Sequence, residues 1–331
     1  MVELCGHSGD ITKIASLQNE QFLLTSSKDN TLRLWNLDSF QCIHTFEGHS
    51  DWVRDFTISP DEKYIFSASD DWSIKQWDLT NKTLKSNFTG HTMAVTNVFV
   101  SNDCGELYSA SRDQSICVWD INTQQSVVTI DTKQDWINQC LLTPDSSILI
   151  SVGLDKSICL WDLSDYSCLA SFHEHTSTIN KILITSDGTK LISCDRDKKI
   201  YLWDIPNHQL IHTFLNDQPI IDIASANQIL VSVAQNGIVT IYNITNYKKI
   251  GFFPFNNNNI EHIVLTPDSK YIFIATADST IYFCSLDGKI IAFWKLSALT
   301  AVVFYILPKK HWLCIGTEES SVQILDYSDL C

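Results

Sequence analysis

The chain has 331 residues, 44% of them apolar and 11% aromatic, so it can build a large core. Lys and Arg number 23 against 38 Asp and Glu, a formal net charge of −15, which disfavours nucleic acid and anionic membrane as partners because both require a cationic surface. Residues 1–20 lack the basic start and apolar run of a secretory signal, and no segment approaches the roughly 20 apolar residues of a membrane helix.

The chain begins with a short apolar segment, residues 2–5, directly before the pair Gly6-His7. Four further segments follow that are rich in β-branched, leucine and aromatic residues and are bounded by turn residues. They span residues 11–17, 22–26, 31–37 and 41–46. This pattern predicts four strands in the first repeat, preceded by one strand that has no repeat of its own.

The frame of that first repeat returns along the chain. In the second repeat, His49 opens the frame, a Ser-x-Ser-x-Asp turn ends at Asp71, and Trp77 closes the frame 28 positions after the histidine. Repeat four carries Lys133 where the others have histidine. The closing tryptophans recur every 42 residues, as Trp35, Trp77, Trp119, Trp161 and Trp203. A period near 40 with this punctuation is typical of propeller blades.

After Trp203 the motif decays but the frame persists, with Tyr242, Cys284 and Leu325 at the tryptophan position. The sequence therefore predicts an all-β fold: an eight-bladed propeller with four-stranded antiparallel blades, in one domain over residues 1–331. The repeats end near residues 36, 78, 120, 162, 204, 243, 285 and 326. The last repeat lacks a fourth strand, so the N-terminal strand is expected to fill that place and close the ring.

These motifs resemble those of the WD-repeat β-propeller family, and the resemblance covers nearly the whole chain. In that family the His, Ser, Asp and Trp of a repeat form a buried hydrogen-bonded chain, which gives the indole N–H a partner. The resemblance implies four complete sets: His7, Asp29 and Trp35; His49, Asp71 and Trp77; His91, Asp113 and Trp119; His175, Asp197 and Trp203. The serine of the second set is Ser67 or Ser69.

A Ser-His-Asp hydrolase uses the same side chains, so the sets have a catalytic alternative to their structural role. Four copies favour a blade clamp over an active site, and no Gly-x-Ser-x-Gly elbow is present. The remaining histidines show no metal-ligand spacing and there is no glycine-rich phosphate loop, so we predict no enzyme activity, no metal and no cofactor. The eleven cysteines contain no Cys-x-x-Cys pair, which favours reduced thiols and a cytoplasmic location, with a nuclear or cytoskeletal one also compatible.

The resemblance also implies where a partner binds. In the family, partners commonly bind the top face, at residues that flank the apolar anchor of each first strand or precede the turn aspartate. Mapped onto this chain, these positions include Lys28, Trp52, Arg54, Arg112, Trp136, Asn180 and Arg196. Tryptophan and arginine are enriched at binding hot spots, and arginine grips carboxylate or phosphate with two hydrogen bonds. Alternatively, these cations pair with neighbouring carboxylates such as Asp10, Asp51 and Asp70.

The resulting hypothesis is a non-catalytic protein-interaction scaffold whose top face binds an acidic or phosphorylated peptide or protein segment, with no nucleic acid, membrane or metal partner. A second hypothesis is a structural subunit of a large assembly, cytoskeletal for example, that uses outer strands such as residues 41–46 or 248–253. A hydrolase is a remote third.

Overall fold

A computed structural model describes residues 1–255, 259–297 and 301–330, which form 32 strands and one short 3-10 helix, η1 (Ser328–Leu330). The strands of the first half are β1 (Val2–Cys5), β2 (Ile11–Ser16), β3 (Phe22–Ser27), β4 (Leu32–Asn36), β5 (Gln41–Phe46), β6 (Val53–Ile58), β7 (Tyr64–Ser69), β8 (Ser73–Asp78), β9 (Thr83–Thr89), β10 (Val95–Val100), β11 (Glu106–Ser111), β12 (Ser115–Asp120), β13 (Gln125–Asp131), β14 (Ile137–Leu142), β15 (Ile148–Gly153) and β16 (Ile158–Asp162). Those of the second half are β17 (Cys168–Phe172), β18 (Ile179–Ile184), β19 (Lys190–Asp195), β20 (Lys199–Asp204), β21 (Gln209–Leu215), β22 (Ile220–Ala226), β23 (Ile229–Ala234), β24 (Ile238–Asn243), β25 (Lys248–Pro254), β26 (Ile260–Leu265), β27 (Tyr271–Thr276), β28 (Thr280–Ser285), β29 (Ile290–Lys295), β30 (Ala301–Leu307), β31 (Trp312–Thr317) and β32 (Ser321–Asp326).

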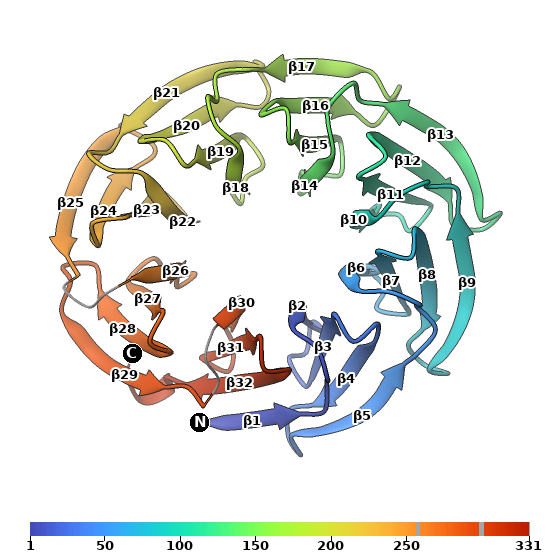
Figure 1. The fold of residues 1–331 in the computed structure, drawn as a ribbon, viewed down its shortest axis with the longest axis horizontal. Coiled ribbons are helices and arrows are strands. Elements are labelled where there is room, and N and C mark those ends of the chain that lie inside the picture. The colour runs from blue at the N-terminus through green and yellow to red at the C-terminus, as the bar shows by residue number, and fades with distance from the viewer. Residues whose placement is uncertain (256–258, 298–300, 331) are drawn as a thin grey trace. The chain divides into compact units, whose positions relative to one another are not determined.

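These strands form eight four-stranded sheets, seven of them built from four consecutive strands in chain order (Figure 1). The eighth has the order β1-β32-β31-β30, and β1 pairs antiparallel with β32 from Val2 opposite Ile324 to Cys5 opposite Ser321. The N-terminal strand thus supplies the fourth strand of the last repeat, as predicted. Eight sheets of this pattern are the blades of an eight-bladed β-propeller, which confirms the predicted fold class.

By contact density the described chain divides into two compact units. The first contains residues 1–140 and 301–329, and the second contains residues 141–300 together with residue 330. The sheets of repeats one to three and of repeat eight belong to the first unit, and those of repeats five to seven belong to the second.

The third strand of each repeat is almost wholly buried because its sheet is covered on both faces. In β8, only the last of six residues has notable exposure. Between the first two sheets, Leu24 and Phe46 of one sheet pack with Phe56 and Trp77 of the next. The rings of Phe46 and Trp77 lie 5.6 Å apart, so the closing tryptophan of one repeat packs on the fourth strand of the preceding one.

A β-bulge recurs near the start of the first strand of seven repeats. In the second repeat, Val53 pairs with Ser69 and Asp55 pairs with Ala68, so Arg54 between them has no partner in the register. A bulge of this kind bends the strand and redirects the side chain of the extra residue. In these seven repeats the residue that follows the apolar anchor is the extra residue of the bulge.

One buried position departs from the repeat. Gln76 in β8 is fully buried, yet its side-chain nitrogen and oxygen have no hydrogen-bond partner among the described residues. Its cross-strand neighbour Ser86 carries a buried hydroxyl that is also without a partner there. Other repeats place an apolar residue at this point of the third strand, namely Leu34, Val118, Leu160 and Leu202.

We expect Gln76→Leu to raise the free energy of unfolding by about 1–3 kcal/mol, because it removes the desolvation cost of an unpaired amide at similar volume. Urea unfolding of the variant beside the wild type measures this. The isosteric Gln76→Glu is the control and should lower stability. A Gln76→Leu variant no more stable than the wild type would mean that the amide is satisfied in solution.

Candidate functional site

Two groups of residues are candidates for the functional site. The first is the repeated His-Ser-Asp-Trp set. In the second repeat, His49 Nδ1 donates to Asp71 at 2.7 Å, and the Ser67 hydroxyl lies 2.7 Å from His49 Nε2. The indole Nε1 of Trp77 donates to the same hydroxyl at 2.8 Å. The serine is therefore Ser67, while Ser69 accepts a hydrogen bond from the backbone N–H of Asp71.

The first and third repeats repeat this geometry. In the first, Thr25 stands in the serine position, between His7 and Trp35. In the third, Ser109 lies between His91 and Trp119, and Asp113 accepts from His91 at 2.8 Å. In the fourth repeat, which lacks the histidine, Trp161 still donates to Ser151. Each hydroxyl is buried and already serves an indole and, where present, an imidazole, so no serine of these sets is free to attack a substrate.

The predicted set of the fifth repeat was wrong in one residue. His175 pairs with Asp195 at 2.8 Å, not with Asp197, which contacts the Thr176 hydroxyl instead. Asp195 ends β19, where the first three repeats have a serine, and there it is almost completely buried beside the imidazole. It also accepts a hydrogen bond from the backbone N–H of Asp197, so it replaces both the serine and the aspartate of the other turns.

In the second repeat, the electrostatics favour a neutral histidine beside an ionised aspartate, whereas in the third repeat hydrogen bonds with Asp113 and Cys117 outweigh burial and raise the pKa of His91 to about 9. Burial lowers the pKa of His49, against the opposing effect of Asp71. Burial would raise the pKa of Asp71, but hydrogen bonds from His49 and Ser73 outweigh it and hold that pKa well below its usual range. In both groups the folded state thus disfavours proton uptake relative to the unfolded state.

We therefore expect stability to fall on acidification. A pKa that is lowered by folding contributes stability that is present above the unfolded pKa and is lost as pH falls below it. The loss should begin below about pH 6.5 through His7 and His49, whose pKa values folding lowers, and continue below about pH 4 through the aspartates. The contribution of His91, whose pKa folding raises to about 9, is fully present in this range and is lost only as pH rises through about 9. Urea midpoints across this range measure it, and Asp71→Asn should flatten the lower part of the profile. A profile identical to that of the wild type would contradict the role of this carboxylate.

The second set is a cationic-aromatic cluster in the first unit, which we define as Lys28, Trp52, Arg54, Arg112 and Trp136. Its members lie where the second strand of a repeat ends and the first strand of a repeat begins. Trp52 and Trp136 are about two-fifths exposed, at 41% and 40%, although aromatic rings of this size are usually covered. Both follow an aspartate whose carboxylate accepts the tryptophan backbone N–H at 2.8 Å.

A cation from the preceding repeat lies over each tryptophan ring of the cluster. Lys28 Nζ lies 4.7 Å from the Trp52 ring, and the Arg112 guanidinium lies 5.4 Å from the Trp136 ring. Arg54, the bulge residue, also lies over Trp52, at 5.8 Å. At this range a cation is attracted to the face of the ring.

The cations of the cluster differ in their ion pairing. Lys28 pairs with Asp10 at 2.6 Å, and Arg54 forms two hydrogen bonds to Asp70. The Arg112 guanidinium has no ion pair with any residue that the structure describes, and its buried Nε atom has no hydrogen-bond partner there. Burial and the nearby charge of Arg54 lower the pKa of Arg112. The cluster thus holds one guanidinium without an ion-pair partner among the described residues, and the only opposing influence on its pKa is the charge of Asp70, which is itself paired with Arg54.

Two predicted site residues lie in the second unit. Arg196 is exposed, and its backbone N–H donates to Ser177. Asn180 is half-buried in β18. The sequence predicted Asp10 and Asp70 only as possible ion-pair partners of these cations. The recurrent bulge at which Arg54 lies had no signal in the sequence.

Other sites find no support in the described residues. Among them, no group of three or more His, Cys, Asp or Glu side chains could hold a metal ion. The ten described cysteines are all free thiols. None of the helical structure in the described ranges is long and apolar enough to cross a membrane.

Comparisons with known proteins match the repeat. The family model "WD domain, G-beta repeat" matches residues 1–36, 40–78, 82–120, 124–162 and 166–204, more than half of the chain. A nuclear distribution protein nudF 1 of Talaromyces marneffei is 35% identical over 52 residues, which are 16% of this chain and 11% of that protein. Nuclear distribution protein PAC1 of Mycosarcoma maydis is 46% identical over 39 residues, 12% of this chain and 9% of that protein.

A third relative is the non-functional target of rapamycin complex subunit LST8-2 of Arabidopsis thaliana, 38% identical over 58 residues, 17% of this chain and 18% of that protein. In all three cases the match spans less than a fifth of the relative's length.

Proposed function

Starting from the fact that this chain belongs to the WD40 repeat family, whose propellers generally serve as platforms for protein interaction, we propose that it is a non-catalytic scaffold that binds an acidic or phosphorylated protein segment at the cationic-aromatic cluster. The observation that carries the proposal is Arg112, a guanidinium that has no ion pair among the described residues and lies over a partly exposed tryptophan. A planar guanidinium whose charge is not neutralised can accept a carboxylate or phosphate in two parallel hydrogen bonds.

The surrounding geometry supports this role. Trp52 and Trp136 offer rigid apolar surface, so a bound segment loses little entropy in meeting them. The net charge of −15 makes a cationic cluster the part of the surface to which an acidic ligand is attracted. The non-catalytic part of the proposal is supported by the buried His-Ser-Asp-Trp sets, in which side chains such as that of His49 are inaccessible to a substrate.

We expect Arg112→Glu and Trp136→Ala each to weaken binding of an acidic partner about 30-fold, the equivalent of roughly 2 kcal/mol for a hot-spot residue. Affinity purification identifies native partners, and titration of a panel of acidic, phosphorylated and neutral peptides measures affinity. Binding should weaken as salt is raised because screening reduces exposed charge interactions. Lys63→Glu, an exposed cation that pairs with Asp61 outside the cluster, is the matched control.

A second candidate function is that of a subunit that joins a larger assembly through its outer strands. Substitutions at the two surfaces distinguish it from the first. That candidate is favoured by exposed apolar side chains on β25 and β29, among them Ile250 and Phe293. If Ile250→Ser with Phe293→Ser abolishes partner capture while Arg112→Glu leaves it intact, the cluster proposal is wrong and the outer-strand one stands. The names of the matched relatives describe those proteins, and the short matches transfer no specific partner to this chain.

A further inference from the structure

The fourth strands of repeats six and seven carry an aromatic side chain at a position where the other repeats are polar. The register identifies this position in every sheet, because it lies opposite the third-strand residue two before the tryptophan position. Repeats six and seven have Phe252 of β25 and Phe293 of β29 there. The other six repeats have Thr45, Asn87, Thr129, Ser171, Thr213 and Glu3. The blade architecture therefore does not require an aromatic side chain at this position.

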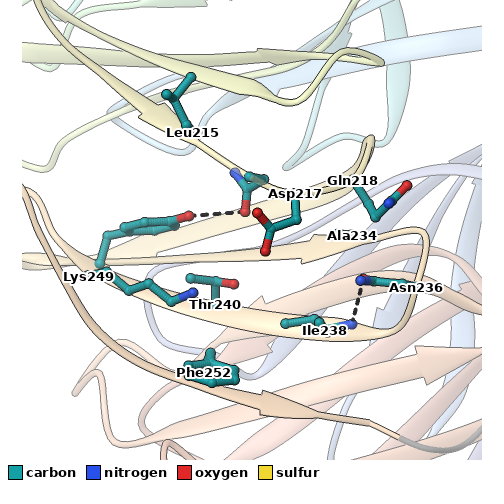
Figure 2. Close-up of a pocket in the computed structure, with 11 residues that line it drawn as sticks. Leu215, Asp217, Gln218, Ala234, Asn236, Ile238, Thr240, Lys249 and Phe252 are labelled. Atoms are coloured by element: carbon teal, nitrogen blue, oxygen red, sulfur yellow. Dashed lines mark hydrogen bonds between the residues drawn. The ribbon is translucent and has the colours of Figure 1, made fainter.

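Both phenylalanines face solvent, Phe252 at 63% and Phe293 at 66% exposure. Phe252 and the equally exposed Leu215, at the end of β21, line one open groove. Figure 2 shows these two side chains on opposite sides of the groove, with Lys249 between them. All three strands belong to the second unit. Exposed apolar side chains that gather in one region, instead of lying scattered, are typical of an interaction surface.

The sixth and seventh sheets pack together beside these rings. The ring of Phe255, directly after β25, lies 5.0 Å from that of Tyr282 in β28. Tyr282 in turn lies 6.1 Å from Phe293. The two exposed phenylalanines therefore belong to adjacent, directly packed sheets, and one partner can contact both.

Lysines accompany the rings, and carboxylates are absent from the strands that carry them. Residues 209–215, 248–254 and 290–295 contain no Asp or Glu, although the chain has a net charge of −15. Lys248 and Lys249 of β25 form no ion pair with any residue that the structure describes, and Lys249 lies 4.4 Å from the centre of the Phe252 ring. Asp217, from the turn after β21, also lines the groove but is not paired with either lysine. The surface of β25 and β29 is thus apolar and cationic.

The edges of these strands favour a helix over an added strand as the partner. A bulge at Ile250 interrupts β25, and one at Ile291 interrupts β29. Pro254, the last residue of β25, has no N–H to donate. Bulges and prolines make a strand edge a poor template for a further strand. An amphipathic helix needs only apolar surface, which it contacts through side chains spaced i, i+3, i+4 and i+7.

We propose that Phe252, Phe293 and the two lysines of β25 form a docking surface for an acidic amphipathic helix of another protein. The apolar side chains of the helix cover the two rings, and its Asp or Glu side chains pair with Lys248 and Lys249. The proposal rests on the second candidate function above, a subunit that joins an assembly through its outer strands, and names the surface and the chemistry of the partner. The cationic-aromatic cluster lies in the first unit and takes no part in it.

A helical peptide of about 18 residues, with leucine on one face and glutamate on the other, tests the proposal on the full chain. Fluorescence anisotropy of the labelled peptide measures its affinity. Two comparison peptides, one with lysine in place of glutamate and one of the same composition in scrambled order, should each bind about tenfold or more weakly. Absence of binding by the Leu/Glu peptide, or equal binding by either comparison peptide, would overturn the proposal.

Variants tie this binding to the two strands. Phe252→Thr with Phe293→Thr introduces the residue that repeats one, three and five have at the position, so the melting temperature should not change while peptide affinity falls about tenfold or more. Lys248→Glu with Lys249→Glu should also weaken binding, and more so at low salt, because screening already reduces exposed charge interactions at high salt. Val127→Ser, which alters a 52% exposed side chain of β13, is the matched control and should leave the affinity unchanged.

Arg112→Glu distinguishes this surface from the cationic-aromatic cluster. Peptide binding that survives Arg112→Glu and is lost in the phenylalanine double variant supports the proposal. Binding that is lost in Arg112→Glu and kept in the double variant places the helix at the cluster, which overturns this surface and leaves the first proposed function standing. Light scattering examines a second copy of the chain as the occupant: a wild-type dimer that the double variant dissociates would also overturn the acidic helix.

Discussion

Trp77→Ala is expected to lower the free energy of unfolding by about 3–5 kcal/mol, the usual cost of deleting a large aromatic side chain from a packed core. The indole is almost completely buried, packs on Phe46, and donates its N–H to the shared Ser67 hydroxyl. Its removal leaves a cavity and breaks the hydrogen-bonded chain to His49. Urea unfolding monitored by far-ultraviolet circular dichroism measures the loss.

Trp72 provides a matched control in the same repeat. Its ring is 54% exposed at the turn between β7 and β8, so Trp72→Ala should cost well under 1 kcal/mol. His49→Ala should fall between the two, at about 1–3 kcal/mol, because it leaves buried polar partners unpaired. Similar losses in Trp77→Ala and Trp72→Ala would mean that the buried His-Ser-Asp-Trp set does not stabilise the fold.

The second large effect concerns β1. Deletion of residues 1–5 should lower the free energy of unfolding by about 2–5 kcal/mol, because it removes the buried Leu4 from its cluster with Val322 and Ile324. It also exposes the backbone N–H and C=O groups of β32, which pairs with β1. An unpaired strand edge promotes association between chains, so the shortened protein should aggregate. Light scattering after size exclusion and thermal unfolding measure both effects.

Two variants separate the causes. Deletion of Met1 alone leaves the ladder intact and should behave as the wild type. Leu4→Asp keeps the backbone of β1 but buries a charge, so it should destabilise without offering a permanently free edge. If removal of residues 1–5 leaves the melting temperature and the solubility unchanged, the pairing of β1 with β32 contributes nothing to the fold.

The strict period of the first five repeats determined the fold class and blade number, because each blade needs the same buried residues at the same spacing. The strand and turn pattern of the repeat also located Tyr242 and Cys284 in the decayed repeats, although the sixth repeat is shorter, and the missing fourth strand of repeat eight indicated the role of residues 2–5. These are local patterns along the chain, and they can be recognised without knowing which segments pack against each other.

Only the tertiary structure decided the partners of individual polar side chains. Asp195 and Asp197 are equally plausible along the chain, but only Asp195 ends its strand beside the imidazole of His175. Lys28, Arg54 and Arg112 are cations in similar sequence contexts, yet Asp10 and Asp70 neutralise the first two and leave the third free of ion pairs among the described residues. Pairing depends on angstrom-scale approach between segments, and no spacing in the sequence encodes that distance.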